Sequence, residues 1–149
     1  MLESGLFTTK IVSTIAAKNI GKFSICSLIF FFCGYNLAYG IPEGGFIGSF
    51  SMWSDSSELS TGYSDYSDWF FQTMFVCATA AIVSGAVAER IQIWPFCIVA
   101  AIMAGAIYPL SMGWQWGGGW LATSGVSEFD GATLVQACVV AVALAACIV

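Results

Sequence analysis

Long stretches without a charged residue constrain this chain more strongly than any other feature of its sequence. Four such stretches are long enough to cross a bilayer: residues 23–41, 69–88, 91–112 and 132–149. A membrane-crossing helix needs about 20 mostly apolar residues, and in lipid only a helix satisfies every backbone polar group within one segment. The pattern predicts an all-α integral membrane protein, with one domain over residues 1–149 and about four spanning helices in a partial bundle.

Composition excludes a soluble globular domain. Hydrophobic residues make up 58% of the chain and charged residues 9%, whereas a soluble domain has roughly 25% charged residues. Residues 5–20 differ from the uncharged stretches because Lys10 and Lys18 interrupt them. We expect this segment to be the end of a preceding helix or an interfacial turn. It lacks the clean apolar core of a secretory signal.

The distribution of charge predicts how the chain is oriented. If the four stretches alternate in direction, every basic residue falls on one side of the membrane: Lys10, Lys18, Lys22 and Arg90. The connection between the first two stretches carries only acidic charges: Glu43, Asp55, Glu58, Asp65 and Asp68. By the positive-inside rule the basic side is cytoplasmic. We interpret the acidic connection as a solvated surface loop, with a weak attraction for cations as the alternative.

Cysteine and histidine content argues against catalytic and metal-binding functions. All six cysteines lie in the uncharged stretches, no two are arranged as CxxC, and the chain contains no histidine. We expect the cysteines to pack as small apolar side chains rather than to bind zinc. Without histidine the usual nucleophile–base pairs cannot form, and four basic residues are too few for a nucleic-acid surface. The sequence therefore predicts neither an enzyme nor a cofactor, metal or nucleic-acid site.

Small residues predict close helix packing in the second uncharged stretch. They recur at spacings of three and four: Ala78, Ala81, Gly85 and Ala88. This spacing places them on one helical face. Such faces let membrane helices approach closely, so we expect this helix to belong to a bundle. We interpret the two charged residues that follow it directly as anchors at its cytoplasmic end.

Four motifs follow one another in the second half of the sequence. They are FFQTMF at residues 70–75, SGAVAERI at 84–91, WGGGW at 116–120 and SEFDGATLVQ at 127–136. In this order and at about this spacing they resemble the ammonium transporter family, the ammonium/methylammonium permeases and their Rh relatives. At the same places that family reads FFQ..F, SGA.AERI, WGGGWL and a form of DFAGGTLVH.

The resemblance implies a fold and an activity. Members of the family consist of two halves of inverted topology and assemble as trimers, with the substrate path between the halves. This chain resembles the first half alone, so we expect a fragment of a larger protein or a truncated product. The resemblance further implies ammonium transport across the plasma membrane, with ammonium or ammonia as the ligand and a homotrimer of the complete protein in the lipid bilayer.

Aromatic residues around the second and third stretches form the predicted binding site. Phe71 and Phe75 are four residues apart, so their rings project from one helical face. The resemblance implies that these phenylalanines close the outer mouth of a pore, and that Trp116 lies beside a cation-recruitment site. Aromatic faces attract a small cation by about 0.5–2 kcal/mol per contact. An interfacial aromatic belt is the alternative, and we keep it for Trp53, Trp69, Trp94 and Trp114.

Glu128 is the predicted support for this site. The resemblance aligns it with an aspartate that organises the site through hydrogen bonds rather than by touching the cation. An acidic residue before a helix is also an ordinary N-cap, which contributes about 1 kcal/mol. Asp130 is a second carboxylate two residues further on. The register with Phe129 and Thr133 favours Glu128 over Asp130.

Gln136 is the largest departure from the family pattern. The resemblance places a pore histidine here, one of a pair that accepts hydrogen bonds from the permeant species and relays protons. A glutamine amide donates and accepts hydrogen bonds, but it does not titrate near neutral pH. We expect its side chain to face the hydrophobic path inward of Phe75, because lipid offers a polar group no partner. The alternative is an amide that hydrogen-bonds to a neighbouring helix.

Three interpretations of function stay open. The first is a channel or transporter that conducts ammonium or ammonia. The second is a non-conducting ammonium sensor, which the replacement of the pore histidine by Gln136 favours. The third is a truncated fragment without activity of its own. A signalling domain elsewhere in the complete protein would favour the sensor over the transporter.

Overall fold

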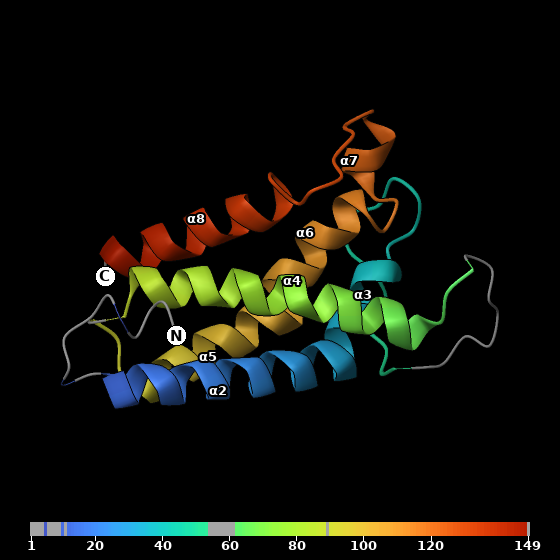
Figure 1. Ribbon diagram of the computed structural model, residues 1–149. Helices are drawn as coiled ribbons and strands as arrows, with labels where there is room; N and C mark the ends of the chain where they lie inside the picture. The colour runs from blue at the N-terminus through green and yellow to red at the C-terminus, as the bar shows by residue number, and fades with distance from the viewer. Residues whose placement is uncertain (1–4, 6–9, 11, 54–61, 89, 149) are drawn as a thin grey trace.

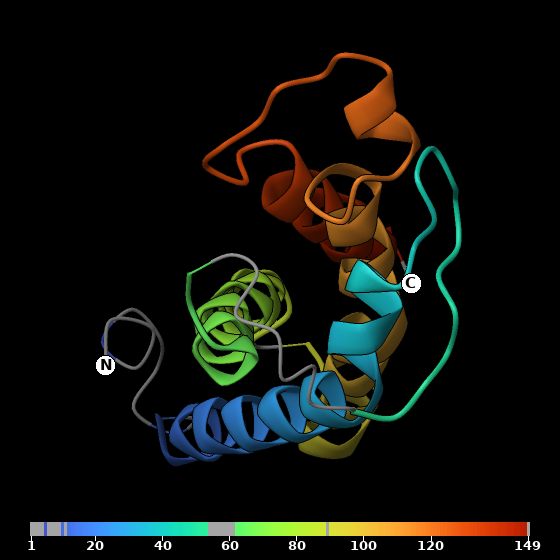
Figure 2. The same ribbon diagram turned by 90° about the vertical axis from the view of Figure 1, so that its right-hand side faces the viewer.

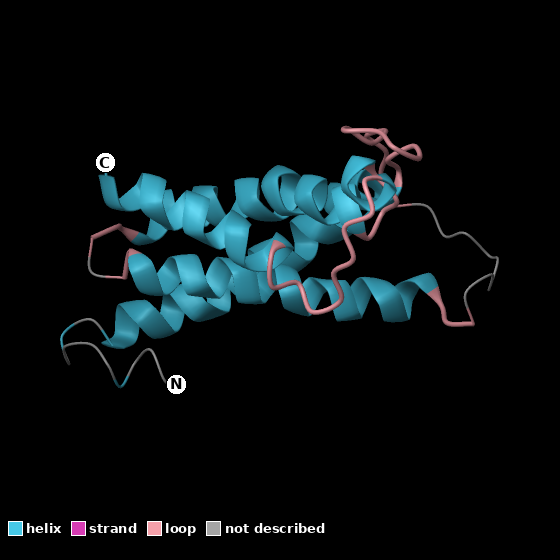
Figure 3. Cartoon of the chain, turned by 90° about the horizontal axis from the view of Figure 1, so that it is seen from above, coloured by secondary structure: helices cyan, strands magenta, loops and turns pink. Residues whose placement is uncertain are grey.

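The computed structural model describes residues 5, 10, 12–53, 62–88 and 90–148. These residues form helices joined by loops, with no strand among them, as Figures 1 and 3 show. The predicted all-α fold is therefore confirmed. Asp55 and Glu58 of the acidic connection, and Glu89, the first charged residue after the second uncharged stretch, lie outside the described residues.

The first membrane-length helix is one continuous unit of 28 residues. It comprises α2 (Val12–Ile29), the π-helical segment η2 (Phe30–Gly34) and α3 (Tyr35–Tyr39). Because it begins at Val12 rather than at residue 23, the expectation that residues 12–20 stand apart from this helix is wrong.

Helix packing explains the early start. Lys18 and Lys22 are both buried, at 2% and 7% exposure, so they lie inside the bundle. The Nζ of Lys18 donates hydrogen bonds to the carbonyl oxygens of Ala88, at 3.3 Å, and Ile91, at 2.6 Å. It also lies 5.8 Å from the centre of the Phe96 ring. A lysine whose ammonium group finds carbonyl acceptors in a neighbouring segment can lie within a buried helix. The local sequence does not show these acceptors.

The second helix, α4 (Asp65–Ala86), begins earlier than the uncharged stretch that predicted it. Ser64 precedes it with extended backbone, and its side chain accepts a hydrogen bond from the Ser67 amide, the arrangement of an N-cap. Asp65 and Asp68 consequently lie in the first helical turn, where acidic side chains are favoured. They belong to the helix and not to the solvated loop that we expected.

The most deeply buried face of α4 lies beside the predicted small-residue face. Ala78 of the predicted face is exposed, and Ala81 and Gly85 are half-buried. Val76, Ala80, Val83 and Val87 are each 1–2% exposed. These buried residues also recur at spacings of four and three, so they form a stripe beside the predicted small-residue face. Helical periodicity identified a packing face but did not say which of two apolar faces the neighbouring helices cover.

The third membrane-length helix extends over 31 residues, Ile93–Thr123. It comprises α5 (Ile93–Ile102), the π-helical segment η3 (Met103–Ile107), α6 (Tyr108–Gln115) and the short α7 (Trp120–Thr123). A fourth apolar helix, α8 (Leu134–Ile148), has 15 residues and is shorter than the predicted stretch 132–149. Three helices thus have the length and composition needed to cross a membrane, and α8 is a shorter apolar helix.

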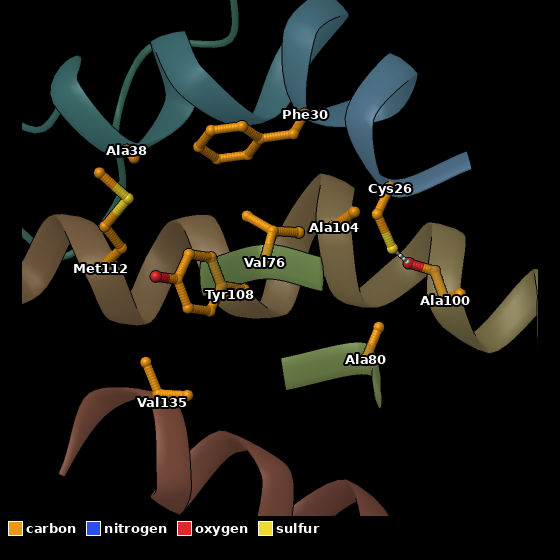
Figure 4. Close-up of a cluster of buried hydrophobic side chains, with 10 residues drawn as sticks. All are labelled: Cys26, Phe30, Ala38, Val76, Ala80, Ala100, Ala104, Tyr108, Met112 and Val135. Carbon is orange, nitrogen blue, oxygen red and sulfur yellow. Dashed lines mark hydrogen bonds between the residues drawn. The ribbon is translucent and has the colours of Figure 1, made fainter. Parts of the chain in front are cut away.

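The helices pack into one bundle in which α4 contacts α2 on one side and α8 on the other. Figure 2 views this arrangement from the end that carries α3 and α7. Figure 4 shows the main core, to which α2, α3, α4, α5, α6, α8 and both π-helical segments contribute side chains. Its buried members are Cys26, Phe30, Ala38, Val76, Ala80, Ala100, Ala104, Tyr108, Met112 and Val135.

The two π-helical segments meet in this core. A side chain at Gly34 would place its Cβ 2.6 Å from the carbonyl oxygen of Ala104 and 3.1 Å from Pro109. Only glycine therefore permits this close approach of the two long helices. A π-helical turn accommodates one extra residue within an α-helix, which lets each helix curve around the contact without breaking.

Basic residues gather at one end of the bundle. Lys18 contacts the turn between α4 and α5 through Ala88 and Ile91, and Arg90 in that turn donates to the carbonyl oxygen of Cys147 near the end of α8, at 3.5 Å. Figure 1 places the opposite end at α3 and α7. The arrangement agrees with the predicted one-sided placement of basic charge, and which end faces the cytoplasm stays a prediction.

The cysteines and tryptophans divide between expected and unexpected environments. Cys26 is buried, four cysteines are half-buried and Cys147 is exposed, so five of the six pack at least partly within the bundle. Trp94 is 78% exposed, as an interfacial residue would be. Trp53 and Trp69 instead pack around Phe31, with ring centres 5.0 Å and 5.4 Å away. The belt interpretation for these two stays a prediction.

Candidate functional site

Helix α4 carries the first two aromatic rings of the candidate site. Phe71 and Phe75 are one helical turn apart, and their ring centres are 5.2 Å apart at an interplanar angle of 71°. Phe71 is 58% exposed, whereas Phe75 is half-buried against the main core. The pair therefore leads from the surface toward the interior of the bundle.

The glycine turn after α6 supplies the third ring. Trp116 ends α6, and its ring centre lies 5.8 Å from that of Phe75. A Cβ at Gly117 would overlap the carbonyl oxygen of Ala38, and Gly118 has a φ of +78°, which favours glycine. The turn thus holds Trp116 against Phe75, as the motif order predicted. The recruitment role of these rings stays a prediction.

Glu128 connects this turn to α8. Its backbone carbonyl accepts a hydrogen bond from the Trp116 indole, at 3.2 Å. Its Oε1 accepts from the backbone amides of Thr133 and, at 3.4 Å, of Leu134, so the side chain caps the start of α8. Asp130 is exposed and makes no such bond. Glu128 is therefore the carboxylate that caps the helix, and its support of a ligand site stays a prediction.

These residues line a pocket with a cavity volume of about 660 Å³. Its wall comes from α3, the residues just before α4, α4 itself, the turn after α6 and the segment before α8. The lining residues are Tyr39, Tyr63, Asp68, Phe71, Gln72, Phe75, Trp116, Glu128, Phe129 and Asp130. Two buried acceptors in this wall, Oε1 of Gln72 and Oε2 of Glu128, have no hydrogen-bond partner among the described residues. The arrangement suits a small cation that donates hydrogen bonds.

Several residues of this wall, among them Tyr39, Asp68 and Gln72, did not emerge from the sequence as site residues. Tyr39 and Gln72 lie within apolar stretches, and Asp68 was interpreted as part of a solvated loop. Gln72 belongs to the FFQ motif and is a polar residue four positions before Val76 on a buried helix. A polar side chain at such a position normally has a bonding role in a bundle, and this signal could have identified it.

Gln136 lies on α8 between the buried residues Val135 and Val139, yet its own side chain is exposed. It does not line the pocket, and it has no hydrogen-bond partner among the residues that the structure describes. The alternative of an amide bonded to a neighbouring helix is therefore not supported within this bundle. A position on a path between two halves stays a prediction.

Comparison with known proteins gives consistent matches over the chain. The Ammonium Transporter Family model matches residues 1–149. The chain is 35% identical to "Ammonium transporter Amt2" of Archaeoglobus fulgidus over 98% of its length and 33% of the relative's. It is 31% identical to an "Ammonium transporter" of Aquifex aeolicus, with coverage of 91% and 33%. The chain spans about a third of the length of these curated relatives.

Proposed function

Because the chain belongs to the ammonium transporter family and is an integral membrane protein with three helices of crossing length, we propose that it serves ammonium transport. In this proposal Phe71, Phe75 and Trp116 recruit the cation at the outer mouth of the path. The complete protein is a homotrimer in the plasma membrane, and its second half supplies the other wall of the path.

The observation that carries this proposal is the combination of aromatic rings and unpaired acceptors in one pocket. Phe75 and Trp116 present rings 5.8 Å apart, and a cation within about 6 Å of a ring centre is attracted by its π-face. Oε2 of Glu128 is a buried acceptor to which no described residue donates. Ammonium offers both a positive charge and N–H donors, so it satisfies the rings and the acceptor together.

The three rings have different positions and therefore different proposed tasks. Phe71 is exposed and meets the cation first. Phe75 and Trp116 lie deeper and replace part of the water shell that the cation loses. Besides offering Oε2 to the cation, Glu128 positions the site, because its backbone carbonyl orients the Trp116 indole while its Oε1 fixes the start of α8.

Titration calorimetry with methylammonium tests the recruitment site in the complete protein that contains this chain. Trp116→Leu should weaken binding about ten-fold or more, since the loss of a desolvated cation–π contact of about 2 kcal/mol corresponds to that factor. Trp94→Leu is the control, because Trp94 is exposed at the start of α5 and does not line the pocket. Equal binding by both variants would contradict the proposal.

The sensor is the second candidate, and one observation favours it. Gln136 stands where the family resemblance places a titratable histidine, and the chain contains no histidine elsewhere. The complete protein in liposomes should therefore carry little ammonium-driven current, and Gln136→His should raise it if the position controls proton relay. Robust current in the unmodified protein that the substitution leaves unchanged would argue for transport and against the sensor.

The proposed orientation places the basic end in the cytoplasm. Lys18, Lys22 and Arg90 lie at or toward that end, and the positive-inside rule assigns it to the cytoplasmic side. Single cysteines in place of Gly62 and Arg90, in a variant without the native cysteines, should react with an impermeant reagent from opposite sides. Labelling of both from the same side would contradict this topology.

A further inference from the structure

A second and smaller pocket adjoins the candidate site. Its cavity volume is about 360 Å³, and its lining residues are Tyr63, Ser67, Asp68 and Phe71. Three of these, Tyr63, Asp68 and Phe71, also line the larger pocket. Asp68 therefore lies where the two pockets meet, outward of Phe75 and Trp116 on the same helix face as Phe71.

The carboxylate of Asp68 is only partly satisfied by the fold. Its Oδ2 accepts one hydrogen bond from the Tyr35 hydroxyl, at 3.0 Å. The Tyr39 hydroxyl also hydrogen-bonds to this carboxylate. Among the described residues Asp68 makes no ion pair, and the placed basic residues Lys18 and Arg90 contact the opposite end of the bundle. A carboxylate can accept about four hydrogen bonds, so the two hydroxyls use about half of its capacity.

Gln72 supplies a second unsatisfied acceptor one helical turn further along α4. Its side chain is 6% exposed. The Nε2 donates to the Tyr39 hydroxyl, at 3.4 Å, which turns the amide oxygen away from that contact. This Oε1 is buried and has no donor among the described residues. A buried acceptor without a partner is unfavourable, and a ligand that brings an N–H group into the pocket relieves it.

The positions of these residues make them act on one ligand. Residues four apart on a helix are neighbours on its surface, and both Asp68 and Gln72 line the larger pocket. The Tyr39 hydroxyl joins them, because it hydrogen-bonds to Asp68 and accepts from the Gln72 amide. We propose that Asp68, Gln72 and Tyr39 form an outer subsite for a small N–H-donating cation of the ammonium class. The cation is held there before it reaches Phe75 and Trp116.

This inference rests on the proposed function and adds Asp68, a negatively charged residue at the entrance of the path. The aromatic rings attract a cation only at short range, whereas a carboxylate in a partly enclosed pocket attracts it over a longer distance. A cation at Asp68 also exchanges part of its water shell for the oxygens of Asp68 and Gln72. Selection for N–H donors follows, because potassium cannot donate a hydrogen bond to the orphan amide oxygen.

Methylammonium and potassium titrations of the complete protein in detergent at low salt test the subsite. Asp68→Asn should weaken methylammonium binding about ten-fold, the effect of removing a hydrogen bond to a charged group. Asp65→Asn is the matched control, because it removes the same charge from the same first turn of α4 without lining the pocket. It should change binding less than about two-fold. Potassium should bind weakly to both.

Two further variants separate binding from folding. Gln72→Met removes the orphan oxygen in a side chain of similar length, and it should weaken methylammonium binding with little change in the thermal midpoint. Tyr35→Phe frees the Asp68 carboxylate and should leave methylammonium binding equal or tighter. If Asp68→Asn does not fold, weaker binding by Gln72→Met still supports the subsite, and unchanged binding overturns it.

The outcomes distinguish this subsite from the proposed function. If the unmodified protein binds no methylammonium, both proposals fail. If Trp116→Leu abolishes binding while Asp68→Asn and Gln72→Met leave it unchanged, the recruitment site stands and the outer subsite is wrong. Equal weakening by Asp68→Asn and Asp65→Asn would also overturn the subsite, because it would show only the general effect of negative charge.

Discussion

The two ends of the bundle differ in whether the fold satisfies the hydrogen-bonding groups of their polar side chains. At the basic end the Lys18 ammonium donates hydrogen bonds to two backbone carbonyl oxygens of the chain itself. At the aromatic end the acceptors of Gln72 and Glu128 have no donor among the described residues. A polar group that the fold satisfies contributes to stability, whereas one that the fold leaves open is available to a ligand. Lys18 thus helps to hold the bundle together, whereas Gln72 and Glu128 are candidates for ligand binding.

The aromatic end nevertheless depends on tight packing. Gly117 approaches the backbone of α3 so closely that no side chain fits there, and the turn that it begins fixes Trp116. The acceptors without donors thus lie next to a tightly packed contact between α3 and the end of α6, which we call the rigid frame. Substitutions that affect the frame should lower stability and binding together, and substitutions of the open groups should lower binding alone.

The largest effect is expected for Gly117→Ala. The added Cβ would overlap the Ala38 carbonyl oxygen and lie 2.9 Å from the Cα of Gly113, so the α3–α6 contact must separate. We expect a loss of about 3 kcal/mol in the free energy of unfolding and weaker methylammonium binding. Gly21→Ala is the control, since its Cβ would meet only the Cys97 sulfur, at 4.0 Å. Similar thermal midpoints for the two variants would contradict the assignment of a rigid frame.

The next largest effect is expected for Lys18→Met. This variant keeps the length of the buried side chain but leaves the carbonyls of Ala88 and Ile91 without their donor, for an expected loss of about 2 kcal/mol. Methylammonium binding should not change, because Lys18 lies at the end opposite the pocket. Lys10→Met, at an exposed position, is the control for charge. A loss of binding as large as that of Trp116→Leu would show that the two ends are coupled.

Much of the fold could be predicted from the sequence because lipid imposes few solutions. Uncharged stretches of crossing length predicted the helices, and the motif order predicted that Trp116 and Phe75 meet. The start of the first helix could not be predicted from Lys18, because the carbonyls that satisfy this lysine come from a segment about 70 residues away. Contacts between distant segments decide whether a charge ends a helix.

The site could be predicted only in part for a similar reason. Ring spacing identified Phe71 and Phe75, but Asp68 and Gln72 became visible only with their partners. A sequence does not show which acceptors remain without donors, because that depends on every neighbour of each side chain. The sequence also did not show that the stripe beside Ala78 is the more deeply buried one, since two apolar stripes at helical spacing lie side by side.

Glu128 has one oxygen that the fold satisfies and one that it does not, and two variants separate capping of α8 from ligand binding. Glu128→Ala removes the cap of α8 and should cost about 1 kcal/mol of unfolding free energy. Glu128→Gln keeps one oxygen for the Thr133 and Leu134 amides, so its loss of stability should be smaller. Both variants should weaken methylammonium binding if the ligand uses Oε2. Binding that follows stability across the pair would assign Glu128 to capping alone.

The smallest effect is expected for Arg90→Gln, although Arg90 shares the basic end with Lys18. Arg90 is exposed, and its one described hydrogen bond, to the Cys147 carbonyl, has a length of 3.5 Å. Exposed contacts of this kind change stability by about 0.5 kcal/mol or less. Thermal unfolding in detergent, with Arg90→Lys as the charge-preserving control, measures the difference. A loss of stability equal to that of Lys18→Met would mean that positive charge in general stabilises this end. A negligible loss would mean that the buried, hydrogen-bonded ammonium of Lys18 stabilises it.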